Sequence, residues 1–226
     1  MRVLGVAAAA LLLTACKATA VRPVASMAVL EPGASMSVEQ LAAAVAEDAR
    51  RSDAEPDAKI REQLAANAGR DAQACLDRAP QAAACLYYHA IALGLEARAH
   101  PLRAGETLKS MIEALGRAEA TDAQIDEAGP ARVKALVLIK APAWPLGPGD
   151  AEAGLASARE AVSLKPQYPP NSLALAEALA KTGDAGDARE AYGRARELSQ
   201  ALPASKDRDD WLRKAQQGLS KLPPSR

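Results

Sequence analysis

Apolar and polar residues repeat with the period of an α-helix along most of the chain, and no segment alternates convincingly with the two-residue period of a strand. Alanine is the commonest apolar residue, and it combines the highest helix propensity with a side chain small enough to let helices approach closely. Proline and glycine divide the pattern into segments. We therefore expect an all-α protein of about nine antiparallel helices joined by short connectors.

Local start and stop signals place these helices. Ser37 opens a capping-box pattern, Pro56 marks a further start, and Pro80 breaks the apolar pattern between two helices. The second helix allows a break near Gly69, because glycine weakens a helix interior. The expected helices are 37–51, 56–79, 81–99, 102–120, 129–140, 151–165, 169–182, 185–200 and 206–219.

A 34-residue period appears in the second half of the chain. Gly149-Asp150 recurs as Gly183-Asp184, and the same shift of 34 residues relates four further pairs of small or apolar residues. This is the length of a helical hairpin of the tetratricopeptide type. The further pairs are Gly154 with Ala188, Ala158 with Tyr192, Ala161 with Ala195, and Leu164 with Leu198.

Residues 169–202 also resemble the tetratricopeptide motif by position. Leu175, Ala176 and Leu179 stand at its first-helix sites, Gly183 at its turn, and Ala188, Tyr192 and Ala195 at its second-helix sites. Ser172 and Gln200 depart from the motif, and upstream units such as 85–94 followed by 108–122 resemble it only weakly. The resemblance implies one TPR-like domain over 37–222, in which degenerate hairpins stack as an α-solenoid with a concave surface.

The amino terminus has the features of a secretory signal. Residues 1–15 hold one positive charge, Arg2, and then an apolar run too short to span a bilayer permanently. Leu13-Thr14-Ala15-Cys16 resembles the lipobox of bacterial lipoproteins, which implies cleavage before Cys16 and lipid attachment to its sulfur; the alternative is an ordinary signal peptide with a chance cysteine. Residues 16–36 then form a flexible tether. Lys17, by resemblance to Gram-negative sorting rules, favours the outer membrane, facing the periplasm.

Charge and motifs argue against several functions. Loss of residues 1–15 removes only Arg2 among charged residues, so the formal charge moves from 0 to −1, without the basic footprint that nucleic-acid binding needs. His89 and His100 are the two histidines, and neither has a metal-ligand partner at helical spacing on its own helix face. No nucleophile, phosphate-loop or dinucleotide motif is present. We expect no enzyme, no metal and no cofactor.

Cys75 and Cys85 lie five residues either side of Pro80, the expected turn of a helical hairpin. Two thiols at equal distance from a turn lie at about the same height on facing helices. An oxidising compartment and the even pair that remains after Cys16 favour a structural disulfide. Two buried free thiols or a redox pair are the alternatives, although this spacing lacks the close CxxC arrangement.

Residues 129–184 carry a more specific resemblance. A helix after Gly129-Pro130, the loop Ala-Pro-Ala-Trp-Pro-Leu-Gly-Pro-Gly-Asp and a Leu/Ala-rich helix together resemble the TatT component associated with TRAP-type transporters, over about Ala114 to Leu202. The resemblance implies a periplasmic lipoprotein with an internal channel for small organic solutes, associated with a solute-binding subunit. The alternatives are a scaffold lipoprotein for an envelope assembly, similar to pilotins or outer-membrane assembly factors, and a tetratricopeptide lipoprotein with an unrelated partner.

Recognition by such a protein is expected on the concave faces of the first helices of each hairpin. In tetratricopeptide phase the candidate groove residues are Leu173, Glu177, Ala180 and Lys181. Tyr87, Tyr88 and His89 join them if their helix lines the same side, and Trp144 of the loop is a further candidate. Each has a core or solvated-face interpretation beside the functional one.

The loop 140–150 interrupts the repeat. Pro142, Pro145 and Pro148 forbid the second half of a helix there, while the 34-residue phase runs through it. It is therefore a remodelled repeat and not a domain boundary. We favour a buried Trp144 that fills the gap left by the missing turns, with a loop at a channel mouth as the alternative.

Overall fold

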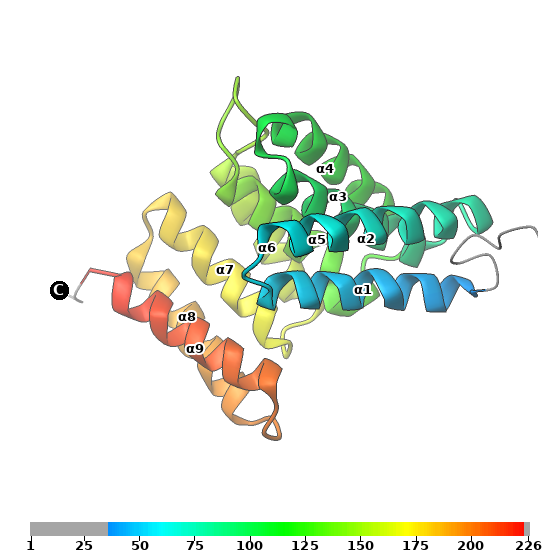
Figure 1. Ribbon diagram of the computed structural model, residues 1–226. Coiled ribbons are helices and arrows are strands. Elements are labelled where there is room, and N and C mark those ends of the chain that lie inside the picture. Colours follow the sequence, from blue (N-terminus) through cyan, green and yellow to red (C-terminus); the bar gives the residue numbers. More distant parts are fainter. Residues whose placement is uncertain (1–35, 224–226) are drawn as a thin grey trace, which may run out of the picture. The chain divides into compact units, whose positions relative to one another are not determined.

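Nine α-helices and one 3₁₀ turn follow one another along residues 36–223, the part of the chain that this computed structural model describes (Figure 1). These residues contain no β-strand, and they belong to one compact unit, Pro32–Arg226. The predicted all-α class is confirmed. The helices are α1 (Val38–Ala54), α2 (Ala58–Arg78), α3 (Ala83–Ala99), α4 (Ala104–Thr121), α5 (Ile125–Lys140), α6 (Ala151–Leu164), α7 (Pro169–Thr182), α8 (Ala185–Gln200) and α9 (Lys206–Lys221), with the 3₁₀ turn η1 at Pro101–Arg103.

Local signals set most helix ends. The capping box at the start of α1 is present: Ser37 Oγ accepts from the Gln40 amide at 3.2 Å, and the Gln40 side chain accepts from the Ser37 amide at 2.8 Å. The predicted bounds of α7 are the observed ones, and Gly183 ends that helix in the left-handed conformation. The break considered near Gly69 does not occur, since α2 is continuous. Packing of α2 against α1 and α3 outweighs the roughly 1 kcal/mol that one glycine costs a helix.

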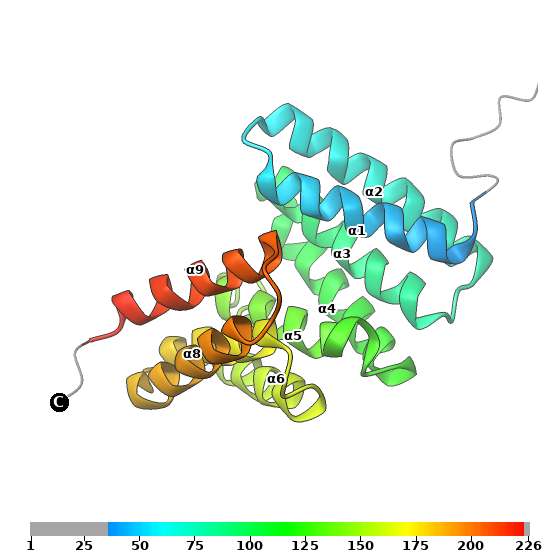
Figure 2. The same ribbon diagram turned by 90° about the horizontal axis from the view of Figure 1, so that it is seen from below.

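The helices form two layers. Successive helices pack against each other, and each odd-numbered helix also contacts the next odd-numbered one: α1 with α3, α3 with α5, α5 with α7 and α7 with α9. We call α1, α3, α5, α7 and α9 the inner layer, and α2, α4, α6 and α8 the outer layer (Figure 2). This alternation is the α-solenoid arrangement that the sequence predicts.

The 34-residue period has a structural counterpart. α6 begins at Ala151 and α8 at Ala185, and each follows an aspartate N-cap, Asp150 or Asp184. Each cap carboxylate accepts from the third amide of its helix, at 3.0 Å for Ala153 and 3.2 Å for Asp187. The repeated pairs of small residues are buried on both helices, and they let α6 and α8 pack closely against α5 and α7.

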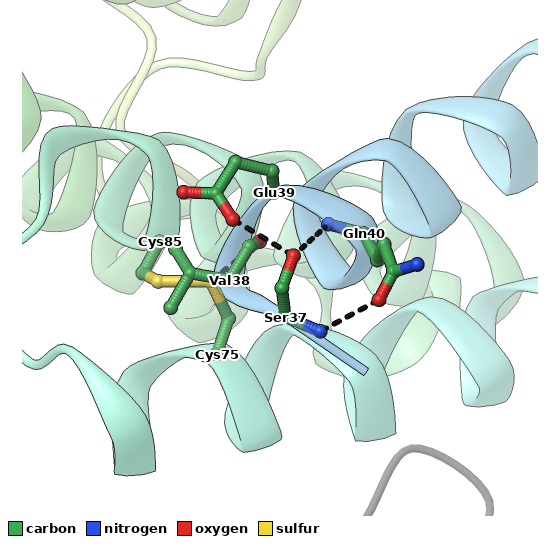
Figure 3. Close-up of a disulfide and its surroundings, with 6 residues drawn as sticks. All are labelled: Ser37, Val38, Glu39, Gln40, Cys75 and Cys85. Carbon is green, nitrogen blue, oxygen red and sulfur yellow. Dashed lines mark hydrogen bonds between the residues drawn. A yellow bond between two sulfur atoms is a disulfide. The ribbon is translucent and has the colours of Figure 1, made fainter. Parts of the chain in front are cut away.

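The predicted disulfide is present in the structure. Cys75 near the end of α2 and Cys85 at the start of α3 are both fully buried, with Cα atoms 5.3 Å apart. The bond closes the hairpin on either side of Pro80 and lies beneath the first turn of α1, beside Val38 (Figure 3). It therefore links α2 covalently to α3, and the first turn of α1 packs against it.

The loop between α5 and α6 corrects one expectation. α5 ends at Lys140, as the prolines require, but the Trp144 side chain is 85% exposed. The interpretation of Trp144 as a buried plug is therefore wrong. The gap needs no plug, because Ile139 and Leu138 of α5 close directly over Gly154 of α6.

The signal peptide 1–15, Cys16 and the tether up to residue 35 lie outside the described residues. Within residues 36–223, no helix is long and apolar enough to cross a membrane.

Candidate binding site on the inner helix layer

The first turn of α5 has an unusual backbone. Asp126, Glu127 and Ala128 have φ angles of 48°, 55° and 64°, in the left-handed region that residues other than glycine rarely adopt. Regular helix starts only at Gly129-Pro130, where the sequence places it. A residue held in this region costs about 1–3 kcal/mol, so specific contacts must fix the turn.

Arg132 supplies several of these contacts. Its side chain is buried, and it donates to the backbone oxygens of Asp126 at 3.0 Å and Glu127 at 2.9 Å. It also donates to Asn171 Oδ1 at 3.1 Å and forms an ion pair with Asp126 Oδ2 at 2.7 Å. A buried guanidinium is costly unless such acceptors surround it, and here it has four.

Asn171 continues the network into α7. Its side chain is 0% exposed, and Nδ2 donates to the backbone oxygens of Glu127 at 3.1 Å, Ala161 at 3.1 Å and Lys165 at 3.0 Å. One amide group thus joins the left-handed turn, the end of α6 and the start of α7. The conformation of the α5 turn is set by residues about 40 positions away in the sequence.

Tyr87 closes the network from α3. Its hydroxyl donates to Asp126 Oδ2 at 2.5 Å, and its ring fills the space in which a Cβ at Gly129 would stand, 2.6 Å away. Burial, with the Asp126 charge next, raises the pKa of Tyr87 well above its usual value, so the phenol stays a hydrogen-bond donor. With Tyr87 protonated and Arg132 saturated, the network fixes shape and is not arranged for proton transfer.

Four of the six aromatic side chains of the chain lie along this network. Tyr88 stacks edge-on against Tyr87, with ring centroids 5.1 Å apart, and Tyr168 stacks edge-on against Trp211 at 5.6 Å. The Arg132 guanidinium lies between the two pairs, 5.1 Å from the Tyr168 ring centroid. We call Tyr87 and Tyr88 on α3, Tyr168 at the N-cap of α7 and Trp211 on α9 the aromatic stripe. Arg132 of α5 lies between its two pairs.

An open cleft lies between α1 and α9, the first and last helices of the inner layer. The end of α1 lies near the start of α9 (Figures 1 and 2). A space of about 590 Å³ separates them, and the two helices do not contact directly. Eight residues line it, and seven of them are charged: Arg50, Asp53, Ala54, Lys206, Asp207, Asp210, Arg213 and Lys214. The inner layer is therefore curved so that its first and last helices share one concavity.

The cleft and the aromatic stripe are electrostatically connected. The pKa of Tyr88 is raised by burial first and by Asp126 next, and Arg50 of the cleft opposes this. The pKa of Tyr168 is likewise raised by burial, and Asp207 of the cleft adds to the rise. The Asp126 side chain is 38% exposed, whereas Arg132, Asn171 and Tyr87 of the network are buried. The groups available for recognition are therefore Asp126, the half-buried Tyr88, Tyr168 and Trp211, and the charged side chains of the cleft.

The structure does not bring the sequence-predicted groove residues together. Tyr87 and Tyr88 belong to the aromatic stripe, but Leu173 is 6% exposed and lies in the hydrophobic core, where it cannot contact a ligand. Glu177 forms an ion pair with Lys140 at 2.7 Å. Trp144 is on the exposed loop, while Ala180 and Lys181 are exposed near the end of α7.

His89 lies in a different groove. It lines a space of about 350 Å³ between α2 and α3 together with His100, over a floor of alanines and Gly69. Burial first, and Arg117 next, lower the pKa of His89, which keeps the imidazole neutral near pH 7. His89 therefore does not share a site with Tyr88.

Asp126, Arg132, Asn171 and Tyr168 were not predicted from the sequence. One local signal was available: Arg132, like Lys134, is a charged residue in the otherwise apolar helix Ala-Arg-Val-Lys-Ala-Leu-Val-Leu-Ile. A charged residue at a core position of a helix implies a buried partner. Nothing local identifies Asn171 as that partner.

No protein-family model matches this chain, and no curated protein matches it. Among solved structures it is similar to a thermophilic TPR protein of Thermus thermophilus, with a TM-score of 0.54 and 20% identity, over 81% of this chain and 92% of that one. The fold is TPR-like. At this identity the similarity extends to the fold alone, and the predicted stacking of helical hairpins is confirmed.

Proposed function

We propose that this protein is a non-catalytic adaptor that holds a protein partner in the cleft between α1 and α9. The observation that carries the proposal is the aromatic stripe and its fixed carboxylate, Asp126, behind a rim of charged side chains. Tyrosine, tryptophan and arginine are the residues that contribute most to protein interfaces. A TPR-like array presents such residues on the curved surface of its inner helices.

The openness of the cleft favours a protein or peptide occupant. A small molecule is usually enclosed by a mostly apolar pocket, whereas this cleft is bounded by seven charged residues. Asp210 is paired with Lys214 at 2.7 Å and also with Arg213, and Asp53 with Arg98 at 2.7 Å. A partner with charges of both signs can replace or extend these exposed pairs at little cost, because surface ion pairs contribute about 0–1 kcal/mol each.

The proposed location is the cell envelope. Cleavage before Cys16 and lipid attachment to it tether the domain to a membrane, and Lys17 favours the outer membrane with the domain in the periplasm. The Cys75–Cys85 disulfide supports export, because such bonds persist in oxidising compartments.

The narrower proposal follows from the resemblance of residues 129–184 to the TatT component. In that form, the partner is the periplasmic solute-binding subunit of a TRAP-type uptake system, and a small organic ligand accompanies it. The second candidate, a scaffold for an envelope assembly, is favoured by the open, charged cleft, which suits a protein surface better than a solute.

Purification of the full chain from detergent-solubilised membranes, followed by mass spectrometry of what is retained, tests the proposal. Tyr88→Ala in the stripe and Arg213→Glu at the rim are each expected to lose most of the retained partner. Arg196→Glu, an exposed charge reversal on the outer-layer helix α8, is the matched control and should retain it.

Three results would discriminate between the narrower proposal, the scaffold and a binding site outside the cleft. Retention of a solute-binding subunit supports the narrower proposal, and retention of assembly proteins supports the scaffold. If Tyr88→Ala and Arg213→Glu, both with unchanged circular dichroism, retain the partner as fully as Arg196→Glu does, the cleft is not the binding site.

A further inference from the structure

The most exposed large apolar side chains of the described residues gather in two loops. Leu102 in η1 is fully exposed, and in the loop between α5 and α6 Trp144 is 85% and Leu146 is 78% exposed. Ile60 and Leu202, the other exposed large apolar residues of this part of the chain, are only about half as exposed. Trp144 and Leu146 contact neither the aromatic stripe nor the core clusters.

The two loops adjoin each other. A Cβ placed on Gly105, three residues after Leu102, would stand 2.9 Å from the carbonyl oxygen of Leu146. The loop 141–150 projects beyond the ends of α5 and α6 next to this turn (Figure 1). Leu102, Trp144 and Leu146 therefore occupy one protruding end of the described unit, which we call the apolar tip.

The loop of the apolar tip is folded on itself. Gly149 donates to the Pro142 oxygen at 2.8 Å, Leu146 and Gly147 both donate to the Ala143 oxygen, and Asp150 donates to the Leu138 oxygen at 2.9 Å. Pro142, Pro145 and Pro148 have no amide hydrogen to satisfy. Most amides of the loop thus need no water, although its side chains face solvent.

The sequence of the loop has the same character. Residues 141–149 of the loop carry no charge, and the basic residue of the tip is Arg103, which follows Leu102 in η1. A Cβ at Gly149 would collide with the backbone of Ala141 and Pro142, so the loop holds its shape through close backbone contact. The result is a protrusion with a tryptophan and two leucines, in which the loop is uncharged and Arg103 follows Leu102.

We propose that the apolar tip inserts into the interfacial layer of a lipid bilayer. Tryptophan is enriched at that layer, where its ring is partly apolar and partly hydrated. Because most amides of the loop are bonded internally, the loop enters a low-dielectric layer at a lower cost in unpaired groups.

Attachment at Cys16, which belongs to the proposed function, makes this insertion effective. The 20 residues from Lys17 to Met36 can extend at most roughly 70 Å, so the domain stays close to the bilayer that holds its anchor. A tethered site acts at an effective concentration in the millimolar range, at which weak insertion of three side chains suffices. The tip then fixes the orientation of the anchored domain, with the partner cleft free of the membrane.

Fluorescence of Trp144 in reconstituted vesicles tests the inference. The chain has two tryptophans, so Trp211→Phe leaves Trp144 as the single reporter. The acylated protein is reconstituted into phosphatidylethanolamine and phosphatidylglycerol vesicles that contain acyl-brominated phosphatidylcholine. We expect blue-shifted Trp144 emission that the brominated lipid quenches, and loss of both effects in Leu146→Asp and in Leu102→Asp. Leu202→Asp, a matched change at an exposed leucine outside the tip, should leave both effects unchanged.

The outcomes separate the tip from the anchor. Protein that floats with the vesicles while Trp144 stays red-shifted and unquenched overturns the inference and leaves the anchor intact. Emission that shifts only when a protein partner is added also overturns it. Protein that does not float with the vesicles contradicts the lipid anchor. Brominated vesicles are then added at millimolar lipid: quenching of Trp144 supports insertion of the tip, and absence of quenching overturns the inference.

Discussion

Among single residues, Asn171 has the largest expected effect on stability. Its fully buried amide accepts from Arg132 and donates to three backbone oxygens in the α5 turn and in α6. Asn171→Ala leaves these groups without partners and should lower the free energy of unfolding by about 3 kcal/mol, because each buried unsatisfied group costs about 1–3 kcal/mol and some relax. Urea unfolding followed by circular dichroism measures the change.

Asn67 provides the matched control. It is the other asparagine whose side chain bonds an arginine, but its partner Arg70 is three residues away on the surface of α2. Asn67→Ala should change the free energy of unfolding by less than about 0.5 kcal/mol. Equal effects of the two substitutions would mean that the buried network does not hold the left-handed turn.

The same residue explains why the candidate site was hard to predict. Tyr87 and Tyr88 were named on the condition that their helix lines the same side as the other groove residues, and α3 does belong to the inner layer. Asn171 reads as an ordinary helix start after Pro169-Pro170, and its bonds run to backbone oxygens that no sequence pattern marks. Leu173 was assigned to the groove by tetratricopeptide phase alone. A shift of two positions along a helix moves a side chain from the groove face to the core face, and Leu173 lies on the core face.

At the scale of elements, the disulfide closes the α2–α3 hairpin and supports the start of α1. A cross-link over 10 residues restricts the unfolded chain and is expected to stabilise by roughly 2–3 kcal/mol. In the presence of dithiothreitol, the unfolding midpoint should therefore move to a lower urea concentration, and the free energy of unfolding should fall by roughly 2–3 kcal/mol. The Cys75→Ala/Cys85→Ala variant should unfold at the same urea concentration with and without the reductant. If dithiothreitol has no effect on the unmodified chain either, the bond does not stabilise the fold.

Helix boundaries were predictable because their causes are local. The capping box at Ser37, the aspartate caps 34 residues apart and the prolines before α3 and α7 act within one helical turn. The loop after Lys140 was predicted for the same reason, since Pro142, Pro145 and Pro148 would stand in the interior of a continued helix, where proline removes a backbone hydrogen bond. The position of Trp144 was not local: burial required a gap between α5 and α6, and the close approach of Ile139 to Gly154 removes it.

The curvature of the inner layer is a property of the whole described unit. It arises because each inner helix contacts the next while the outer helices fill the other side, and it brings α1 and α9 to the two walls of the cleft. The cleft residues Arg50 and Lys206 are separated by almost the whole domain in sequence. Only the confirmed repeat architecture, and no motif, predicts that they face each other.

The α9 wall of the cleft is held less firmly than its inner-layer neighbour α7. α9 ends the array, buries only Ala215 and Gly218, and packs chiefly on α8, whereas α7 buries eight residues between neighbours on both sides. Opening free energy follows buried contacts. Amide hydrogen exchange should therefore be faster along α9 than along α7. If a partner binds in the cleft, it should slow exchange in α9 and at the end of α1 while leaving α7 nearly unchanged. Exchange in α9 as slow as in α7, or protection by the partner confined to the outer helices, would show that the last helix is not the adjustable wall of a binding cleft.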